Sequence, residues 1–164
     1  MPIWSPSVDI IATYAAVVAT GALALEIRRW FESGPRLRLS LMADAAIWNG
    51  HISNDRYFVL NVTNIGNLPT TITHMVLLDY ENIFGYLTKR PKWQALVNEP
   101  QPQTGHGRIP HVIEPGKIWM GMAKFNNDVD LSKRRAKGYL FVGIIASHKS
   151  EVIKIRTSKP AKNV

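Results

Sequence analysis

The stretch IIATYAAVVATGALALEIRRWF, residues 10–31, carries no charge over its first sixteen positions and then runs into Glu26, Arg28 and Arg29. A helix over residues 8–31 would extend about 36 Å at 1.5 Å per residue, which exceeds the ~30 Å hydrocarbon core of a bilayer. The Gly34-Pro35 pair that follows is typical of a helix end. The segment therefore predicts one membrane-spanning helix.

The residues that flank this helix predict its orientation. Trp4 and Trp30 lie at its two ends, as expected for side chains at the two membrane interfaces. Arg28 and Arg29 lie at its C-terminal end, and no lysine or arginine precedes it. The positive-inside rule then places the N-terminus outside and the rest of the chain in the cytoplasm. We expect a single-pass protein of the inner (cytoplasmic) membrane, with membrane lipid as one partner.

Two other interpretations of the apolar segment stay open. The Ala22–Ala24 tripeptide matches the A-x-A site of a cleaved signal peptide, which would make the chain an exported envelope domain. The lack of basic residues in positions 1–9 and the two arginines after the run argue against export. A buried helix of a soluble fold should have a polar face, and residues 10–25 offer only Thr13, Tyr14 and Thr20. We favour a retained anchor.

Small residues recur every fourth position inside the predicted helix. They are Ala12, Ala16, Thr20 and Ala24. Such a stripe lets two helices approach closely in lipid, so it predicts a homo-oligomer through the helix. The alternative is chance, because alanine is common throughout this segment.

After Pro35 the pattern changes from helical to alternating apolar and polar residues, which indicates strands. The predicted strands are 36–41, 57–63, 70–80, 117–125, 139–146 and 151–157, with shorter ones at 83–87 and 93–97. The pattern predicts a mainly β protein with an immunoglobulin-like β-sandwich of about seven strands, or alternatively a small closed barrel. The expected domains are an anchor with its juxtamembrane segment (1–35), the sandwich (36–157) and a basic tail (158–164).

Three local expectations accompany the strands. His74 alternates with Ile72 and Val76, so we expect it on the inner face of its strand. Residues 126–138 are polar and are expected to hold one helical turn. Residues 98–110 contain three prolines and two glycines, which predicts a loop.

Four segments together resemble a family of small uncharacterised bacterial single-pass membrane proteins with an immunoglobulin-like β domain. They are VDIIATYAAVVATGALALEIRRWFESGPRLRLS, VTNIGNLPTTITH, EPGKIWMGM and YLFVGIIASH. The resemblance implies bacterial origin, one anchor and one sandwich domain. It implies no activity for any residue of this chain.

No pattern in the sequence predicts catalysis, a cofactor or a metal. Cysteine is absent, which excludes disulfides and thiol chemistry. His106 and His111 are five residues apart across a proline, a spacing that matches no helical or strand metal pair. Neither a G-x-S-x-G elbow nor a phosphate-binding glycine loop is present. We expect a protein that is not an enzyme and needs no cofactor.

The charge is concentrated at the C-terminal end. The net charge is +8, whereas residues 1–132 contain eleven basic and eleven acidic residues and sum to zero. The candidate contacts for lipid or another polyanion are Lys133, Arg134, Arg135, Lys137, Lys154, Arg156 and Lys159. We favour anionic lipid over nucleic acid, because no aromatic residues alternate with these charges as in stacking modules. A merely solvated basic face is the other interpretation.

The expectation that combines these features is a non-catalytic interaction module, tethered to the inner membrane and bound to another protein. The loop over residues 98–111 is the candidate binding segment, because a long connection in a compact domain is often functional.

Overall fold

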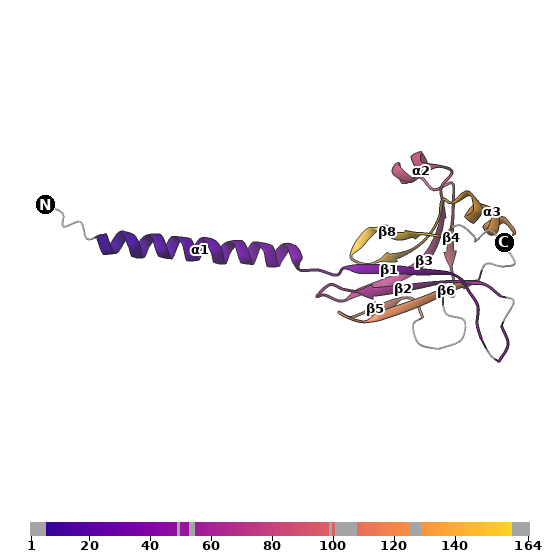
Figure 1. Ribbon diagram of the computed structural model, residues 1–164, viewed down its shortest axis with the longest axis horizontal. Helices are drawn as coiled ribbons and strands as arrows, with labels where there is room; N and C mark the ends of the chain where they lie inside the picture. Colours follow the sequence, from indigo (N-terminus) through magenta and orange to yellow (C-terminus); the bar gives the residue numbers. More distant parts are fainter. Residues whose placement is uncertain are drawn as a thin grey trace. The chain divides into compact units, whose positions relative to one another are not determined.

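The computed structural model describes residues 6–48, 50–52, 55–98, 100, 108–124 and 129–158. The chain divides into two units, Met1–Gly34 and Pro35–Val164. The first contains one helix and the second contains the strands (Figure 1). The two units are described separately.

The first unit is the helix α1 (Pro6–Glu32). Its segment Val8–Trp30 has 23 residues and a mean hydropathy of 1.9, and it is not buried against the rest of the protein. Ser33 ends the helix: its N–H donates to the Arg29 carbonyl at 2.9 Å and its hydroxyl to the Trp30 carbonyl at 2.7 Å. The predicted apolar helix is confirmed. Its length, composition and exposure are those of a membrane anchor or a signal sequence.

The smaller sheet contains β1 (Leu37–Ala45), β2 (Tyr57–Asn64) and β6 (Ile118–Lys124), all antiparallel, in the order β1-β2-β6. Leu37 pairs with Asn64, and Thr63 pairs with Ile118. The start of β1, the end of β2 and the start of β6 therefore lie together. We call this end of the domain, where the chain enters β1, the entry end.

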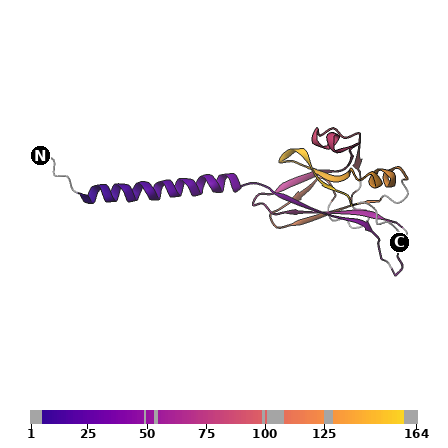
Figure 2. The same ribbon diagram turned by 45° about the horizontal axis from the view of Figure 1, so that its top comes forward.

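The larger sheet contains β4 (Trp93–Val97), β3 (Thr70–Asp79), β7 (Leu140–Ala146) and β8 (Lys149–Arg156), in the order β4-β3-β7-β8. The short strand β5 (His111–Ile113) also pairs with β3, at Thr70–Ile72. All pairs are antiparallel. The two sheets face each other in a sandwich-like arrangement, so the mainly β expectation is confirmed (Figures 1 and 2).

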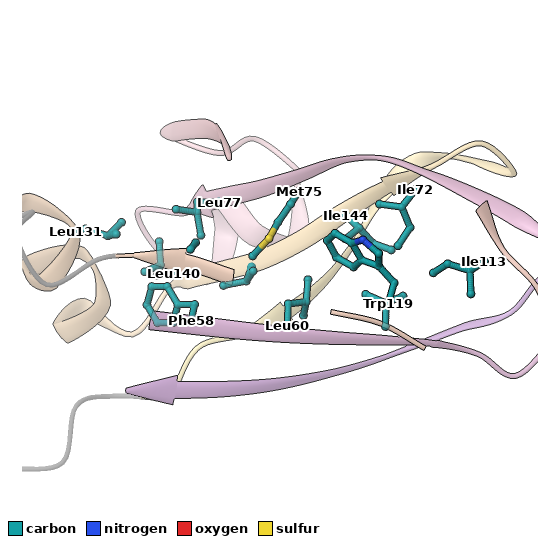
Figure 3. Packing of buried hydrophobic residues seen from close by; sticks show 13 residues of the cluster. Phe58, Leu60, Ile72, Met75, Leu77, Ile113, Trp119, Leu131, Leu140 and Ile144 are labelled. Atoms are coloured by element: carbon teal, nitrogen blue, oxygen red, sulfur yellow. The ribbon is translucent and has the colours of Figure 1, made fainter. Parts of the chain in front are cut away.

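The core fills the space between the two sheets. Among the described residues, thirteen buried ones form it, and Phe58, Leu60, Trp119 and Ile144 are among the largest (Figure 3). Gly121 makes room for the indole, because a Cβ there would lie 2.3 Å from the Trp119 ring. Alternating inward residues on both sheets thus hold the domain together without a disulfide.

Two short helices interrupt the strands. The expected strand at 83–87 is wrong: Ile83–Leu87 forms the helix α2, and the Asn82 side chain caps it by accepting from the Gly85 N–H at 2.9 Å. The expected helical turn within 126–138 is the helix α3 (Val129–Lys137). Because α3 follows the end of β6 and precedes the start of β7, it lies at the end of the sandwich opposite the entry end, which we call the α3 end.

The inward position expected for His74 is also wrong. The pairing of β3 with β7 shifts register between Ile72 and His74. A bulge of this kind adds one residue and reverses the alternation, so Ile72 and Met75 both face the core and His74 is exposed.

Candidate functional site

The outer face of the larger sheet carries a second cluster of apolar side chains. Val76, Leu78, Tyr80 and Phe141 are buried there, away from the core between the sheets. The register brings them together, because Val76 is opposite Gly143 and Leu78 is opposite Phe141 across β3 and β7. The outer face of an antiparallel sheet is commonly polar, whereas here it carries a second, smaller apolar core.

A groove of about 440 Å³ lies on this face. Its lining comes from four strands: Val76, Leu78, Gln94, Ala95, Leu96, Ile145 and Val152. Leu96, on the edge strand β4, is 58 % exposed at the groove. The volume is within the range of about 300–1,000 Å³ that is typical of ligand pockets in proteins.

Three aromatic rings close one side of this face around the Lys154 ammonium. The Tyr86 ring of α2 stacks on Phe141 at 5.0 Å, and Tyr80 meets both rings edge-on. The Lys154 ammonium lies 4.4 Å from the centre of the Tyr80 ring and 4.7 Å from that of Tyr86, and it donates to the Tyr80 hydroxyl. These contacts attach α2 to the sheet and hold a positive charge beside the groove.

The helix α2 exposes apolar side chains to solvent. Ile83, Phe84 and Leu87 all point outward, and Phe84 is 73 % exposed. Figures 1 and 2 both show α2 on the side of the larger sheet that faces away from the smaller sheet. The groove and the tip of α2 therefore belong to one side of the domain, which we call the groove face.

Two cations of β8 lie on the groove face. Lys154 lies opposite Gly143 in the β-ladder, and Arg156 lies opposite Phe141 and over the Tyr139 ring at 5.2 Å. Within the part of the chain that the structure describes, neither cation forms an ion pair. The two candidate polyanion contacts on β8 are thus both placed on the groove face.

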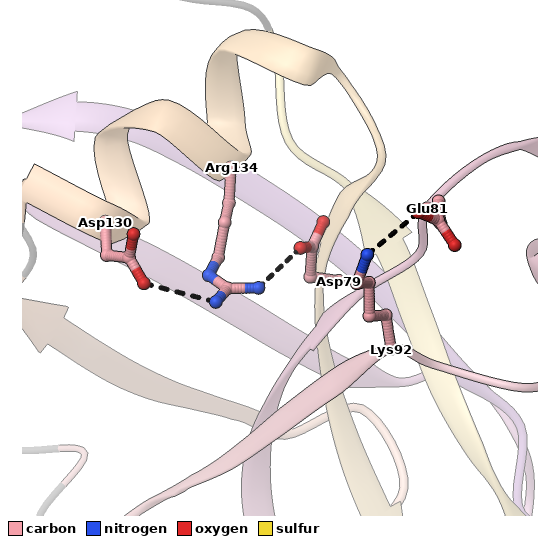
Figure 4. A network of polar contacts seen from close by, with 5 residues as sticks. All are labelled: Asp79, Glu81, Lys92, Asp130 and Arg134. Atoms are coloured by element: carbon pink, nitrogen blue, oxygen red, sulfur yellow. Dashed lines mark hydrogen bonds and ion pairs between the residues drawn. The ribbon is translucent and has the colours of Figure 1, made fainter.

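Two of the candidate polyanion contacts on α3, Arg134 and Arg135, pair with carboxylates of the domain itself. The Arg134 guanidinium donates to the Asp79 carboxylate at 2.8 Å and to Asp130 at 3.2 Å (Figure 4). It also lies over the Trp93 ring. Asp79 is only 3 % exposed, and the hydrogen bond with it raises the pKa of Arg134. Arg134 is thereby an internal counter-ion that holds α3 against β3.

Arg135 is buried and forms a bidentate pair. Its Nη1 and Nη2 donate to the two Asp44 carboxylate oxygens at 2.5 Å each, and its Nε donates to the Ser158 carbonyl at 2.9 Å. These hydrogen bonds lower the pKa of the Asp44 carboxyl. With 3 % of its surface exposed, Arg135 does not present its charge to an external polyanion. Lys133 and Lys137 are exposed on the same helix.

The remaining candidate residues are placed as follows. On α1, Arg28, Arg29 and Trp30 are exposed, and so is the stripe of Ala12, Ala16, Thr20 and Ala24. Trp4, Lys159, His106 and most of the loop over 98–111 lie outside the described residues. Among the described residues no cluster of three metal-ligating side chains occurs.

Sequence reasoning missed the groove face. The groove is lined by residues of β3, β4, β7 and β8, and the unexpected helix α2 lies on the same side of the larger sheet. The signal was present in ENIFGYL, residues 81–87, where an Asn cap precedes apolar residues.

Comparison with known proteins assigns no family. No protein-family model matches the chain, and no curated protein matches it. Among solved structures, a Bordetella pertussis protein provisionally named ApaA is 8 % identical, with a TM-score of 0.40 over 79 % of this chain and 98 % of its own. The structural-genomics target SoR45 is 10 % identical, with a TM-score of 0.32 over 77 % of this chain and 88 % of its own. These similarities are distant.

Proposed function

We propose that the chain is a non-catalytic interaction domain, held at the inner membrane by α1, that binds a partner protein on its groove face. The observation that carries this proposal is the apolar groove of about 440 Å³ on the same side of the larger sheet as the exposed apolar residues of α2. The proposal includes a sandwich of the immunoglobulin-like type and membership in the bacterial single-pass family that the sequence resembles.

The charges around the groove select the kind of partner. Lys154 and Arg156 make this face basic, so a second copy of the chain would bring like charges together there. A flat bilayer surface does not fill a groove. The occupant that fits is a partner segment whose apolar side chains enter the groove and whose acidic side chains meet Lys154 and Arg156.

A peptide probe tests this surface directly. The full chain, labelled with ¹⁵N in lipid nanodiscs, would be titrated with a synthetic peptide of alternating leucine and glutamate. We expect chemical-shift changes at Val76, Leu96 and Val152 that weaken with salt, and much smaller changes with the leucine–lysine counterpart. Equal responses to both peptides, or changes confined to other faces, would reject the acidic partner.

A matched pair of variants provides the control. Leu96 and Met42 are both 58 % exposed, on β4 of the larger sheet and β1 of the smaller sheet. Leu96→Glu should abolish peptide binding because it places a carboxylate at the groove, whereas Met42→Glu should leave binding unchanged. If the two variants behave alike, the groove is not the binding surface.

The tether is tested separately. The helix is long and apolar enough to span, and Arg28 and Arg29 at its end favour a cytoplasmic β domain. We expect the intact chain to stay with the membrane after alkaline carbonate extraction. A mature chain beginning at Leu25 would show a cleaved signal peptide, and an active C-terminal alkaline phosphatase fusion would reverse the orientation.

A further inference from the structure

The entry end of the sandwich exposes apolar side chains on a turn beside the point where the chain enters the domain. The turn over residues 64–69 joins β2 to β3, and in it Ile65 is 60 % exposed and Leu68 is 50 % exposed. The Ile65 N–H donates to the Arg36 carbonyl at 2.8 Å. Arg36 immediately precedes β1, so the apolar turn lies next to the segment that leads to α1.

A buried side chain holds this turn in shape. Asn64 is fully buried, and its Nδ2 donates to the carbonyls of Leu68 at 2.8 Å and Ile113 at 3.1 Å. Its Oδ1 accepts from the Gly66 N–H at 3.0 Å. The turn is thereby fixed on both sides, and Ile65 and Leu68 point outward from a preorganised support. Positions of this kind usually carry polar residues.

Three exposed basic residues and one exposed acidic residue, Glu114, lie on segments next to the apolar turn. The Lys117 carbonyl accepts from the Asn64 N–H at 3.1 Å, which places Lys117 beside the turn. Lys149 follows the turn between β7 and β8. In that turn the Ser147 N–H donates to the Thr71 carbonyl at 2.9 Å, which places Lys149 near the start of β3. Lys117, Lys149 and Arg36 are exposed, and within the described residues none of them forms an ion pair.

We propose that this entry-end surface, made of Arg36, Ile65, Leu68, Lys117 and Lys149, contacts the anionic headgroups of the bilayer that holds α1. Exposed apolar tips beside basic residues are the composition of proteins that lie at a membrane interface. Only four peptide steps separate Glu32, the last residue of α1, from Arg36, which is at most about 14 Å of extended chain. The inference rests on the anchor in the proposed function and is independent of the partner protein.

The length of the sandwich determines whether the basic residues of α3 can approach the bilayer together with the entry-end surface. Strand β1 has nine residues, so its eight steps of about 3.3 Å put the two ends of the sandwich roughly 26 Å apart. Screening reduces charge attraction beyond about 8 Å at physiological salt. When the entry end touches the headgroups, Lys133 and Lys137 at the α3 end do not contribute to membrane attraction.

Spin labels test the contact, since a chain without cysteine accepts one label at a chosen position. The full chain carrying Ile65→Cys, or Ser132→Cys on α3 as the matched control, would be placed in nanodiscs of phosphatidylcholine with or without phosphatidylglycerol. We expect the label at position 65 to become accessible to lipid-soluble oxygen and protected from a water-soluble nickel chelate when phosphatidylglycerol is present. The label at position 132 should stay in water.

Charge variants complete the test. With the label at position 65, Lys117→Glu plus Lys149→Glu should reduce membrane contact at least about 25-fold, near fivefold for each lysine lost. Lys133→Glu plus Lys137→Glu changes the net charge equally and should leave the contact unchanged. An aqueous label at position 65 in phosphatidylglycerol discs, or equal effects of the two charge pairs, overturns this inference alone. A chain that does not enter the discs overturns the anchor as well.

Discussion

The two ends of the sandwich use positive charge in opposite ways. At the α3 end, Arg134 and Arg135 reach inward to Asp79 and Asp44, and they hold the helix to the sheets. At the entry end, Lys117 and Lys149 stay exposed beside the apolar turn. The basic residues are thus densest in the sequence at the α3 end, where two of them stabilise the fold through ion pairs within the domain. The number of charges in a segment predicts an external surface only when no carboxylate of the same domain lies within reach.

The largest effect should follow the loss of Arg134. Replacement by glutamine, Arg134→Gln, leaves Asp79 as a buried carboxylate without its counter-ion, and breaking such a pair costs about 3 kcal/mol of unfolding free energy. Urea unfolding of the full chain in nanodiscs, followed by near-ultraviolet circular dichroism, measures it. Adding Asp79→Asn should recover part of the loss, because the buried charge is then gone.

The control for this variant lies three residues along the same helix. Lys137→Gln removes an exposed charge and should change the unfolding free energy by less than about 0.5 kcal/mol. If Lys137→Gln is as destabilising as Arg134→Gln, the contrast between internal and external charge at the α3 end is wrong.

These internal pairs explain which parts of the molecule the sequence predicts. Strands follow from alternation within a few residues, so most strand positions were predicted correctly. Arg134 and Asp79 are 55 positions apart in the chain, and Arg135 and Asp44 are 91 apart, and no local pattern links such partners. The same limit applies to the groove face, whose lining comes from four strands that are distant in sequence.

Two local errors have local causes. The apolar run at Ile83–Leu87 is too short for periodicity to separate a strand from a helix, and the Asn82 cap decides for the helix. The bulge near His74 reverses the alternation, and it becomes visible only in the register between β3 and β7.

A smaller effect is expected for Arg135→Met, which preserves most of the side-chain volume. The variant loses the bidentate pair with Asp44 and the hydrogen bond to Ser158, but Asp44 is about half exposed and water replaces part of the loss. We expect about 2 kcal/mol of destabilisation in the same urea experiment. Lys133→Met, two residues earlier and on the exposed side of the same helix, should stay within about 0.5 kcal/mol. If the two variants lose the same unfolding free energy, the ion pair of Arg135 does not stabilise the domain.

At the entry end, Asn64→Ala should destabilise the domain by about 1.5 kcal/mol. It leaves the carbonyls of Leu68 and Ile113 and the Gly66 N–H without their partner, although water reaches part of the turn. Ile65→Ser changes only the exposed tip and should be near neutral in urea, while it weakens lipid contact. An Asn64→Ala chain as stable as the wild type would show that the turn is not held by this amide.

The smallest effect concerns His148, which shares a 2.7 Å hydrogen bond with the Thr70 hydroxyl at the entry end. Burial lowers the pKa of the His148 imidazole, and the charge of Lys149 lowers it further. Because the folded pKa lies below the unfolded value, the domain binds fewer protons than the unfolded chain, and its stability falls as the pH drops below about 6.5. The decrease in Tm between pH 8 and pH 5.5 should therefore be smaller for His148→Gln than for the wild type. Differential scanning calorimetry of both chains measures it. An identical loss in both chains would mean that His148 is not the group that makes the entry end sensitive to acid.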